Sequence, residues 1–326
     1  MGRNGFLRTL CVALASLALL AANAHAQTDN YPSKNIRVIV GFAAGGGNDL
    51  IARVVAQELQ NALGQTVVVE NRVGAGGRVA AEYVMREPPD GHTLLVGASG
   101  AMAISPAVIE KIPYVTLRDF APVSMIASFP LVMATSIDHP AKTVKEFVAW
   151  AKANPDKSNY GTTSPAFTLT VELLKLKSGA PITAIPYKSG NEMVMSVMSN
   201  NSSMTIVDPP PAVPQIQAGK LRGLAVTATT RMEELPDVPT MPEAGYPDVL
   251  VSLWNGIFAP PGTPKPIVQK LETEIRRIMQ LPDVKQKFRT MATIPVGSTS
   301  QEFIALIEKE TAMWRGVAKD ANLKFE

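Results

Sequence analysis

One stretch, residues 36–55, limits what this chain can fold into more than any other. Ile36–Val40 is rich in β-branched residues without an alternating polar face, which is typical of a strand covered on both sides. Gly45-Gly46-Gly47 follows, and apolar residues then recur at helical spacing, at Leu50, Ile51, Val54, Val55, Leu59 and Leu63. The pattern predicts a strand, a glycine turn and a helix whose unshielded N-terminal N–H groups hold one end of an anionic ligand.

The first 26 residues predict a secretory signal peptide. Arg3 and Arg8 form a positively charged segment ahead of the apolar segment Leu10–Ala22, and Ala24-His25-Ala26 supplies small residues for cleavage. The only cysteine, Cys11, falls inside this peptide, so the mature chain is expected to need no disulfide. No later run is apolar over the roughly 18 residues that suggest a membrane span. We therefore expect an exported, soluble protein.

The charge balance gives no electrostatic case for nucleic acid. Lysine and arginine number 31 against 28 aspartates and glutamates, and removal of Arg3 and Arg8 leaves a net charge of about +1. The aromatic content of 6% is too low to suggest a stacking surface for sugars or bases. Cleavage after Ala26 leaves 300 of the 326 residues, enough for two domains of roughly 150 residues each.

Three predicted strands place their ends on one edge of a sheet. Thr66–Glu70 and Thr93–Gly97 follow the opening strand, and the first two strands form a β-α-β unit with a right-handed crossover. Their ends, at Gly41, Asn71 and Ala98, would lie along the carboxyl edge of the sheet. Ligands bind at that edge in open α/β sheets.

A second lobe is indicated from Phe120 onward. Ala121–Ser128 and Leu131–Ser136 are extended segments separated by Phe129-Pro130, and Ser252–Phe258 is predicted to be the return crossing. We expect an α/β protein in which residues 27–128 and 250–326 form lobe one and residues 129–249 form lobe two. Two chain crossings join the lobes, with hinges near Phe129–Leu131 and Val249–Leu253. The last third is predicted to be helical, at Pro264–Gln280, Pro282–Met291 and Ser300–Ala321.

The second lobe carries a strand-to-helix turn built of hydroxyls. The short strand Asn159-Tyr160 leads into Gly161–Thr168, and a helix follows to about Ser178. Hydroxyl groups can donate to a carboxylate as N–H groups do. This turn is therefore a second candidate site for an anionic ligand.

Two charged residues of the second lobe allow two interpretations each. Asp208 follows the predicted strand Met204–Val207, and it either caps the turn Pro209–Pro211 or accepts a hydrogen bond from a ligand or bridging water. Lys188 is either a counter-ion for a carboxylate or a solvated surface charge.

The glycine turn also allows alternatives. A dinucleotide site would need a third glycine at position 50, which is Leu50. The turn could instead need positive φ and bind nothing. Asp49 lies in the first helical turn, where an acid stabilises the helix dipole. Because a carboxylate would repel an anion, we expect Asp49 to brace the loop rather than contact the ligand.

The inventory of catalytic residues is thin. His25 leaves with the signal peptide, and His92 and His139 lie in predicted turns or loops. No His, Cys, Asp and Glu set has metal-ligand spacing, and Gly97-Ala98-Ser99-Gly100 lacks the closing glycine of a nucleophile elbow. We expect no catalytic residue, metal or cofactor. An exported hydrolase is the less favoured alternative.

Several motifs resemble those of the periplasmic receptors of tripartite tricarboxylate transporters, the Bug family. They occur in order along the whole mature chain. They are Tyr31-Pro32-Ser33-Lys34, Gly45-Gly46-Gly47-x-Asp49, Val68-Val69-Glu70-Asn71-Arg72-x-Gly74-Ala75-Gly76-Gly77, Pro89-Asp90-Gly91-x-Thr93-Leu94-Leu95, Asp119-Phe120-Ala121-Pro122-Val123, Pro186-Tyr187-Lys188, Ala218-Gly219-Lys220-Leu221-Arg222, Leu235-Pro236-Asp237-Val238-Pro239-Thr240 and Phe258-Ala259-Pro260-x-Gly262-Thr263-Pro264.

The resemblance implies a type II periplasmic-binding-protein fold whose two α/β lobes close over a small carboxylate. Loop backbone groups and bridging water would hold the carboxylate, and the loaded protein, a monomer, would hand it to a two-component membrane permease. The pocket departs from the family pattern. Gly41, Ala43 and Ala44 stand where prolines are usual, Pro165–Thr168 shortens the second turn, and Pro209 replaces a common asparagine. These changes favour a ligand with an apolar body.

We therefore expect a periplasmic receptor for a mono-, di- or tricarboxylate, aromatic acids included. The alternative from another class is a ligand-sensing partner of a membrane sensor kinase. The expected ligand-binding residues are Phe42, Ala43, Ala44, Asn48 and Ser99 from lobe one, and Thr162, Thr163, Ser164, Phe167, Thr168 and Asp208 from lobe two.

Overall fold

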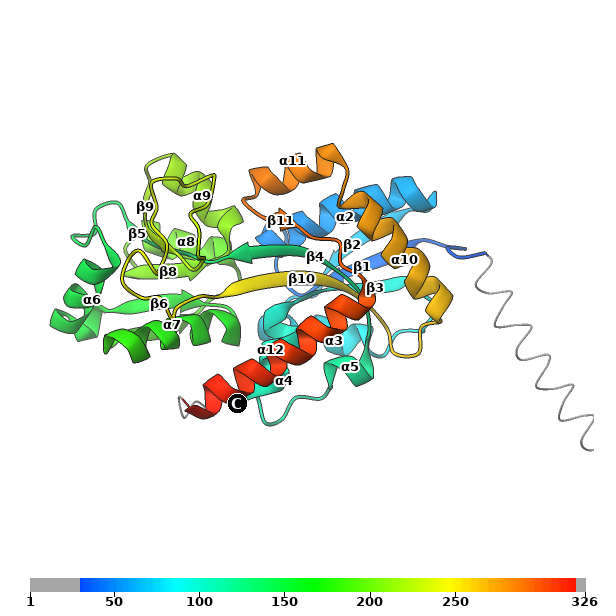
Figure 1. Ribbon diagram of the computed structural model, residues 1–326, viewed down its shortest axis with the longest axis horizontal. Helices are drawn as coiled ribbons and strands as arrows, with labels where there is room; N and C mark the ends of the chain where they lie inside the picture. Colours follow the sequence, from blue (N-terminus) through cyan, green and yellow to red (C-terminus); the bar gives the residue numbers. More distant parts are fainter. Residues whose placement is uncertain (1–29, 321–326) are drawn as a thin grey trace, which may run out of the picture.

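The computed structural model describes residues 30–320, so the predicted signal peptide and Cys11 lie outside the described residues. The chain forms two β-sheets with helices packed on both, joined by two long strands near the middle of the molecule (Figure 1). We call the six-stranded sheet with its helices the first lobe and the five-stranded sheet with its helices the second lobe. No helix within residues 30–320 is both long and apolar enough to cross a membrane.

The first sheet begins with the predicted strand, turn and helix. Strand β1 (Ile36–Val40) lies between β2 (Val67–Asn71) and β3 (Thr93–Ala98) and is parallel to both. Helix α2 (Gly47–Leu63) starts at the third glycine of the turn and buries Ile51, Val55 and Leu59, among other residues, against the sheet. The three predicted strands are confirmed, and they share the edge where the candidate site lies.

The other strands of the first sheet run antiparallel. Strand β10 (Ser252–Ala259) lies between β3 and β4 (Ala121–Pro130), and β11 (Ile294–Pro295) pairs with β4, which gives the order β11-β4-β10-β3-β1-β2. The predicted break at Phe129-Pro130 is wrong, because both residues belong to β4. Proline is tolerated there because β11 pairs with β4 at Ser128 and Ala127 and does not reach Pro130, which lies at the edge of the sheet on that side.

The second sheet has the order β7-β6-β8-β5-β9. Strand β6 is parallel to β7 and β8, whereas β5 is antiparallel to β8 and β9. The strands of this sheet are β5 (Val132–Ser136), β6 (Asn159–Thr162), β7 (Thr183–Pro186), β8 (Met204–Val207) and β9 (Leu221–Val226). The helices of this lobe are α6 (Val144–Ala153), η3 (Pro155–Lys157), α7 (Pro165–Ser178), α8 (Gly190–Met198) and α9 (Pro209–Gln217).

Helices cover the first lobe as the periodic patterns predict. The C-terminal third forms α10 (Lys265–Ile278), α11 (Pro282–Thr290) and α12 (Ser300–Asp320), which confirms the three predicted helices within the described residues. Short helical segments complete this lobe: η1 (Ala75–Gly77), α3 (Arg78–Val84), η2 (Gly100–Ile104), α4 (Ser105–Val108) and α5 (Thr116–Asp119). The chain passes between the sheets twice, from β4 to β5 and from β9 to β10.

Candidate functional site

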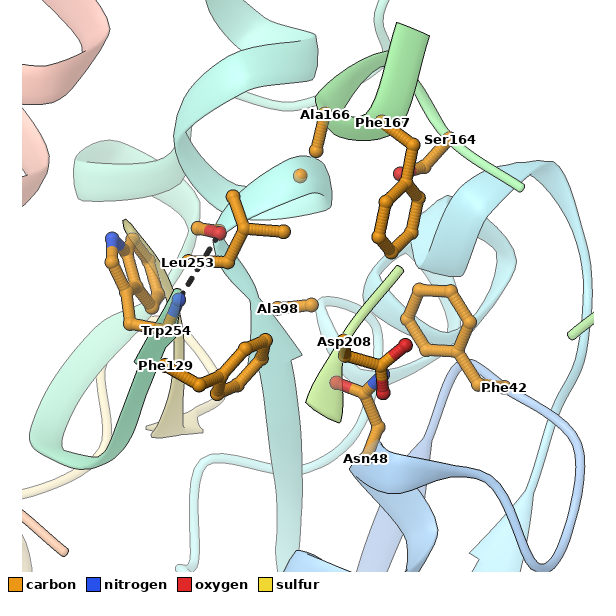
Figure 2. Close-up of a pocket in the computed structure, with 12 residues that line it drawn as sticks. Phe42, Asn48, Ala98, Phe129, Ser164, Ala166, Phe167, Asp208, Leu253 and Trp254 are labelled. Atoms are coloured by element: carbon orange, nitrogen blue, oxygen red, sulfur yellow. Dashed lines mark hydrogen bonds between the residues drawn. The ribbon is translucent and has the colours of Figure 1, made fainter. Parts of the chain in front are cut away.

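A cavity lies between the two lobes at the carboxyl edges of β1, β3, β6 and β8. Its lining residues leave only about 20 Å³ of room for water, so the two lobes nearly close this space in the structure. Figure 2 shows Ser164, Ala166 and Phe167 at one end of the cavity and Asn48 and Asp208 at the other. The complete lining is Phe42, Asn48, Ala98, Ser99, Gly100, Phe129, Ser164, Ala166, Phe167, Asp208, Leu253 and Trp254.

The side chain of Asp49 holds the glycine turn before α2 in place. Its buried carboxylate accepts hydrogen bonds from the Gly45 N–H at 2.9 Å, from the Arg53 guanidinium at 2.8 Å and from the Asn71 amide at 2.8 Å. Burial raises the pKa of Asp49, but these hydrogen bonds outweigh burial and lower the pKa overall. The predicted bracing role of Asp49 is therefore confirmed.

The three glycines of the turn serve different purposes. Gly45 has a φ of 78°, which favours glycine, so the turn needs a glycine at this position whether or not it binds a ligand. Gly47 lies in the helix and needs to be glycine for another reason. A Cβ atom at this position would overlap the carboxylate of Asp208 from the second lobe.

Asp208 lies between the first residues of two helices. Its Oδ2 faces Gly47 of α2, and its Oδ1 would be 2.9 Å from a Cβ atom on Gly190, the first residue of α8. Nearby, the Asn191 amide donates a hydrogen bond to the Gly45 carbonyl at 3.2 Å, a second link between the lobes. Asp208 precedes α9 but makes no side-chain cap, so the capping interpretation is wrong.

The electrostatics of the cavity are set by Asp208 and by neutral groups. The side chain of Asp208 is 6% exposed, and its burial raises its pKa to about 6. Among the described residues that line the cavity, none is lysine, arginine or histidine. Lys188 is exposed and does not line the cavity, so its interpretation as a surface charge fits the structure better.

The turn before α7 presents one hydroxyl to the cavity. Ser164 is the N-cap residue of this 14-residue helix, and Pro165 follows it at the first helical position. The backbone of the first lobe approaches Ser164 closely, because Cβ atoms on Gly76 and Gly100 would lie 2.9 Å from its Cβ and 3.2 Å from its Oγ. Ser164 and the first N–H groups of α7 are therefore placed at the upper end of the cavity in Figure 2.

Of the other predicted residues of this turn, Phe167 lines the cavity and the three threonines do not. The Thr162 and Thr168 hydroxyls lie 3.0 Å apart and 3.1 Å and 3.3 Å from the Ser164 carbonyl oxygen, so one hydroxyl donates to the other, which donates to the carbonyl. They are satisfied within the turn and stabilise its shape. Thr163 turns its carbonyl oxygen toward Gly76 of the first lobe. Thr162, Thr163 and Thr168 thus support the site from outside the lining.

In the first lobe the structure likewise separates the predicted residues. Phe42, Asn48 and Ser99 line the cavity, whereas Ala43 and Ala44 do not. Ala43 instead closes the turn, because its carbonyl accepts a hydrogen bond from the Gly46 N–H at 3.2 Å, and Ala44 is exposed. In this lobe the lining therefore comes from the strand ends and the first turn of α2.

Sequence reasoning missed the floor of the cavity, which Phe129, Leu253 and Trp254 form. These residues could have been found from the sequence, because the two predicted crossings contain Phe129 and Leu253. A segment that joins two lobes passes beside the space between them. Trp254 is held by its backbone N–H, which donates to Ser99 Oγ at 3.3 Å, and by its indole N–H, which donates to Glu310 at 2.7 Å. Burial raises the pKa of Glu310 to about 7.

The cavity is suited to an amphipathic anion. Aromatic and aliphatic side chains supply most of the wall, and the polar groups are two hydroxyls, one amide and one carboxyl. Hydroxyls and helix N-terminal N–H groups can hold a carboxylate without a cationic partner. The described residues that line the cavity include two serines. They include no histidine that could act as a base for a serine, and no cysteine that could act as a nucleophile.

Comparison with known proteins agrees with this geometry. The model of the tripartite tricarboxylate transporter family receptor matches residues 51–323. Protein BugT of Bordetella pertussis is 35% identical over 323 residues, covering 98% of this chain and 99% of BugT. The solved structure of R. palustris Rpa4515 with adipate has a TM-score of 0.87 at 33% identity, covering 90% of this chain and 99% of that one. MatC from Rhodopseudomonas palustris with bound malate has a TM-score of 0.84 at 30% identity, covering 88% and 99%. The resemblance is therefore confirmed: the chain belongs to the tripartite tricarboxylate transporter receptor family and has the fold of its periplasmic binding proteins.

Proposed function

We propose that this protein is a periplasmic receptor that captures a small carboxylate between its lobes and delivers it to the permease of a tripartite tricarboxylate transporter. The observation that carries the proposal is the cavity between the lobes, with Ser164 and the N-terminus of α7 at one end and apolar walls around it. The relatives solved with adipate and with malate support the choice of a carboxylate.

The carboxylate of the ligand would bind at the end of the cavity formed by Ser164, Ala166 and Ser99. The N–H groups of Ala166 and Phe167 belong to the first turn of α7 and have no partner within the helix. The Ser99 hydroxyl accepts from the Trp254 N–H, which leaves its own proton free to donate. The remainder of the ligand would lie against Phe42, Phe167 and the floor.

Capture would require the lobes to move. We propose that residues 27–128 and 250–326 move against residues 129–249, with hinges near Phe129–Leu131 and Val249–Leu253, where the two connections leave the first sheet. Cleavage of residues 1–26 during export would release the mature receptor as a monomer. Deletion of the protein should abolish uptake of the ligand, whereas a sensor would leave uptake intact.

A ligand screen tests the proposal. Thermal shifts of the mature protein should be measured with aliphatic, hydroxylated and aromatic carboxylates, followed by calorimetry of each ligand that shifts the melting temperature. A carboxylate at 100 times its Kd should stabilise the protein by about 2.7 kcal/mol. If all carboxylates leave the melting temperature unchanged and calorimetry detects no heat of binding, the proposed function is wrong.

A matched pair of variants tests the binding mode. Ser164→Ala removes a hydroxyl that lines the cavity, and its affinity for the carboxylate found in the screen should fall severalfold, as expected for one lost hydrogen bond of about 1 kcal/mol. Thr163→Val removes a neighbouring hydroxyl outside the lining and should leave the affinity unchanged. The reverse ranking would move the carboxylate away from Ser164.

A further inference from the structure

A second hollow between the lobes, which we call the rear groove, lies beside the edge strand β11. The first lobe lines it with Ile294 and Pro295 of β11 and with Lys285 and Arg289 of α11, and the second lobe lines it with residues that follow β9, between 228 and 234. The rear groove leaves about 520 Å³ of room for water, against about 20 Å³ in the cavity. The lobes are thus nearly closed at the cavity and apart at the rear groove.

The two strands that cross between the lobes separate the cavity from the rear groove. In the first sheet, β4 and β10 stand between β11, which lines the groove, and β3, which ends at the cavity. Consecutive residues of β4 face the two spaces, Phe129 the cavity and Pro130 the groove, as the opposite faces of a strand require. Figure 1 shows α11 and β11 together on one side of these strands. A rotation of the lobes about β4 and β10 that widens the cavity therefore narrows the rear groove.

The contacts between the lobes differ on the two sides. On the cavity side, the Asn191 amide of the second lobe donates to the Gly45 carbonyl of the first at 3.2 Å. Across the rear groove, Arg289 of α11 and Glu233 of the second lobe form an ion pair at 4.0 Å, with side chains 64% and 85% exposed. Such a solvated pair of long side chains constrains the distance between the walls only weakly. The bulk of the side chains in the groove is then what limits the approach of its walls.

We propose that the rear groove is a conformational stop that sets the balance between open and closed lobes, and with it the affinity for the ligand. Side chains that fill the groove hold its walls apart and favour the closed cavity, whereas the room beside small residues such as Ala228 and Thr230 permits opening. A ligand held by the closed form binds with an affinity reduced by the fraction of molecules that are closed, so a shift in this fraction changes Kd. The inference rests on the proposed function, which supplies the ligand and the hinge motion.

Replacement of Ile294 by tryptophan tests the stop. Ile294 is 60% exposed and lines the rear groove but not the cavity, so the larger ring enters the groove without displacing the core or touching the ligand. The Kd of the carboxylate found in the screen should fall by up to about tenfold, the gain expected when a closed state populated at roughly 10% becomes dominant. Calorimetry measures this change.

The matched control places the same ring elsewhere on the first lobe. Met313 is 48% exposed on α12 and lines neither the cavity nor the rear groove, so Met313→Trp should bind as the wild type does. The inference is wrong if Ile294→Trp leaves Kd unchanged or raises it, and also if both tryptophans lower Kd equally. If Ile294→Trp does not fold, Thr230→Trp takes its place, because Thr230 is an exposed residue of the opposite wall and the same fall in Kd is expected.

A measurement without ligand separates the stop from the proposed function. The only cysteine, Cys11, falls in the predicted signal peptide, so spin labels can be attached to the mature chain through Val79→Cys of the first lobe and Met195→Cys of the second. These residues are 45% and 59% exposed, and electron paramagnetic resonance gives the distance between the two labels. Ile294→Trp should shift the unliganded protein toward the shorter distance. If no carboxylate binds, the proposed function fails while this distance still decides the inference, and an unchanged distance distribution overturns it.

Discussion

Replacement of Gly47 by alanine is expected to weaken ligand binding while leaving the fold intact. Gly47 has a helical backbone without positive φ, so alanine fits α2 and by itself adds about 0.4–1 kcal/mol to the free energy of unfolding. When the lobes are in contact, however, its Cβ atom would overlap Asp208 and lie 3.2 Å from Cγ of Pro210. Asp208 cannot easily withdraw, because its other oxygen already lies close to Gly190.

The size of the effect follows from the cost of overpacking. Such insertions cost about 1–3 kcal/mol, and here the cost falls only on the state in which the lobes meet. The Kd of the carboxylate should therefore rise about 5- to 150-fold. Calorimetry measures Kd, and urea unfolding of the unliganded variant measures its stability.

The control for this experiment is another helical glycine. Gly316 lies exposed on α12, and a Cβ atom there would have no neighbour within 4 Å. Gly316→Ala should gain the same helical stability and bind the ligand as the wild type does. Wild-type affinity in Gly47→Ala would show that the contact between Gly47 and Asp208 plays no part in capture, and the reasoning about lobe approach would be refuted.

Three predictions concern charged groups, and urea unfolding across pH measures each. Because burial raises the pKa of Asp208 from 3.8 to about 6, the native state binds the extra proton between these values and stability falls as pH rises through them. Asp208→Asn should therefore gain up to about 3 kcal/mol relative to wild type on going from pH 4 to pH 7. The pKa of Glu310 is raised to about 7, so Glu310→Gln, which can still accept from Trp254, should show the same trend between pH 4.5 and 7. Asp49→Ala should lose about 2 kcal/mol or more at pH 7, and because the pKa of Asp49 is lowered, this loss should shrink as pH falls below about 4. A difference that does not change with pH would show that the carboxylate in question does not titrate as the structure implies.

The sequence predicted those parts of the fold that depend on local patterns. Strand β1 and helix α2 follow from β-branched residues and helical spacing within a single stretch of chain, and the amphipathic C-terminal helices follow in the same way. The continuity of β4 through Pro130 could not be predicted, because it depends on pairing with Ser252, more than a hundred residues away. Such pairing leaves no local signal.

At the site, too, local patterns predicted some features, whereas features that depend on contacts between distant segments could not be predicted. Asp208 was correctly expected at a strand end, but its contact with Gly47 joins two lobes and could not be inferred from either segment alone. Thr162 and Thr168 are as polar as Ser164 in the sequence, and only the fold reveals that they hydrogen-bond each other. Polar residue type therefore identified the turn, whereas the satisfaction of each hydroxyl decided which one faces the cavity.

Three glycines of the first lobe are explained by the same feature, the close approach of the second lobe. Gly47, Gly76 and Gly100 each lie where the first lobe meets a side chain of the second, Asp208 at one end of the cavity and Ser164 at the other. Since a Cβ atom at any of them would crowd or overlap the opposite lobe, the missing side chains let the lobes meet on both sides of the ligand space. The neutral donors between these contacts would have to balance the charge of a bound carboxylate, because no cation lines the cavity among the described residues. Such buried dipoles are screened little by salt, so affinity governed by them should depend weakly on ionic strength. Binding that weakened steeply with salt would instead require a basic surface outside this cavity.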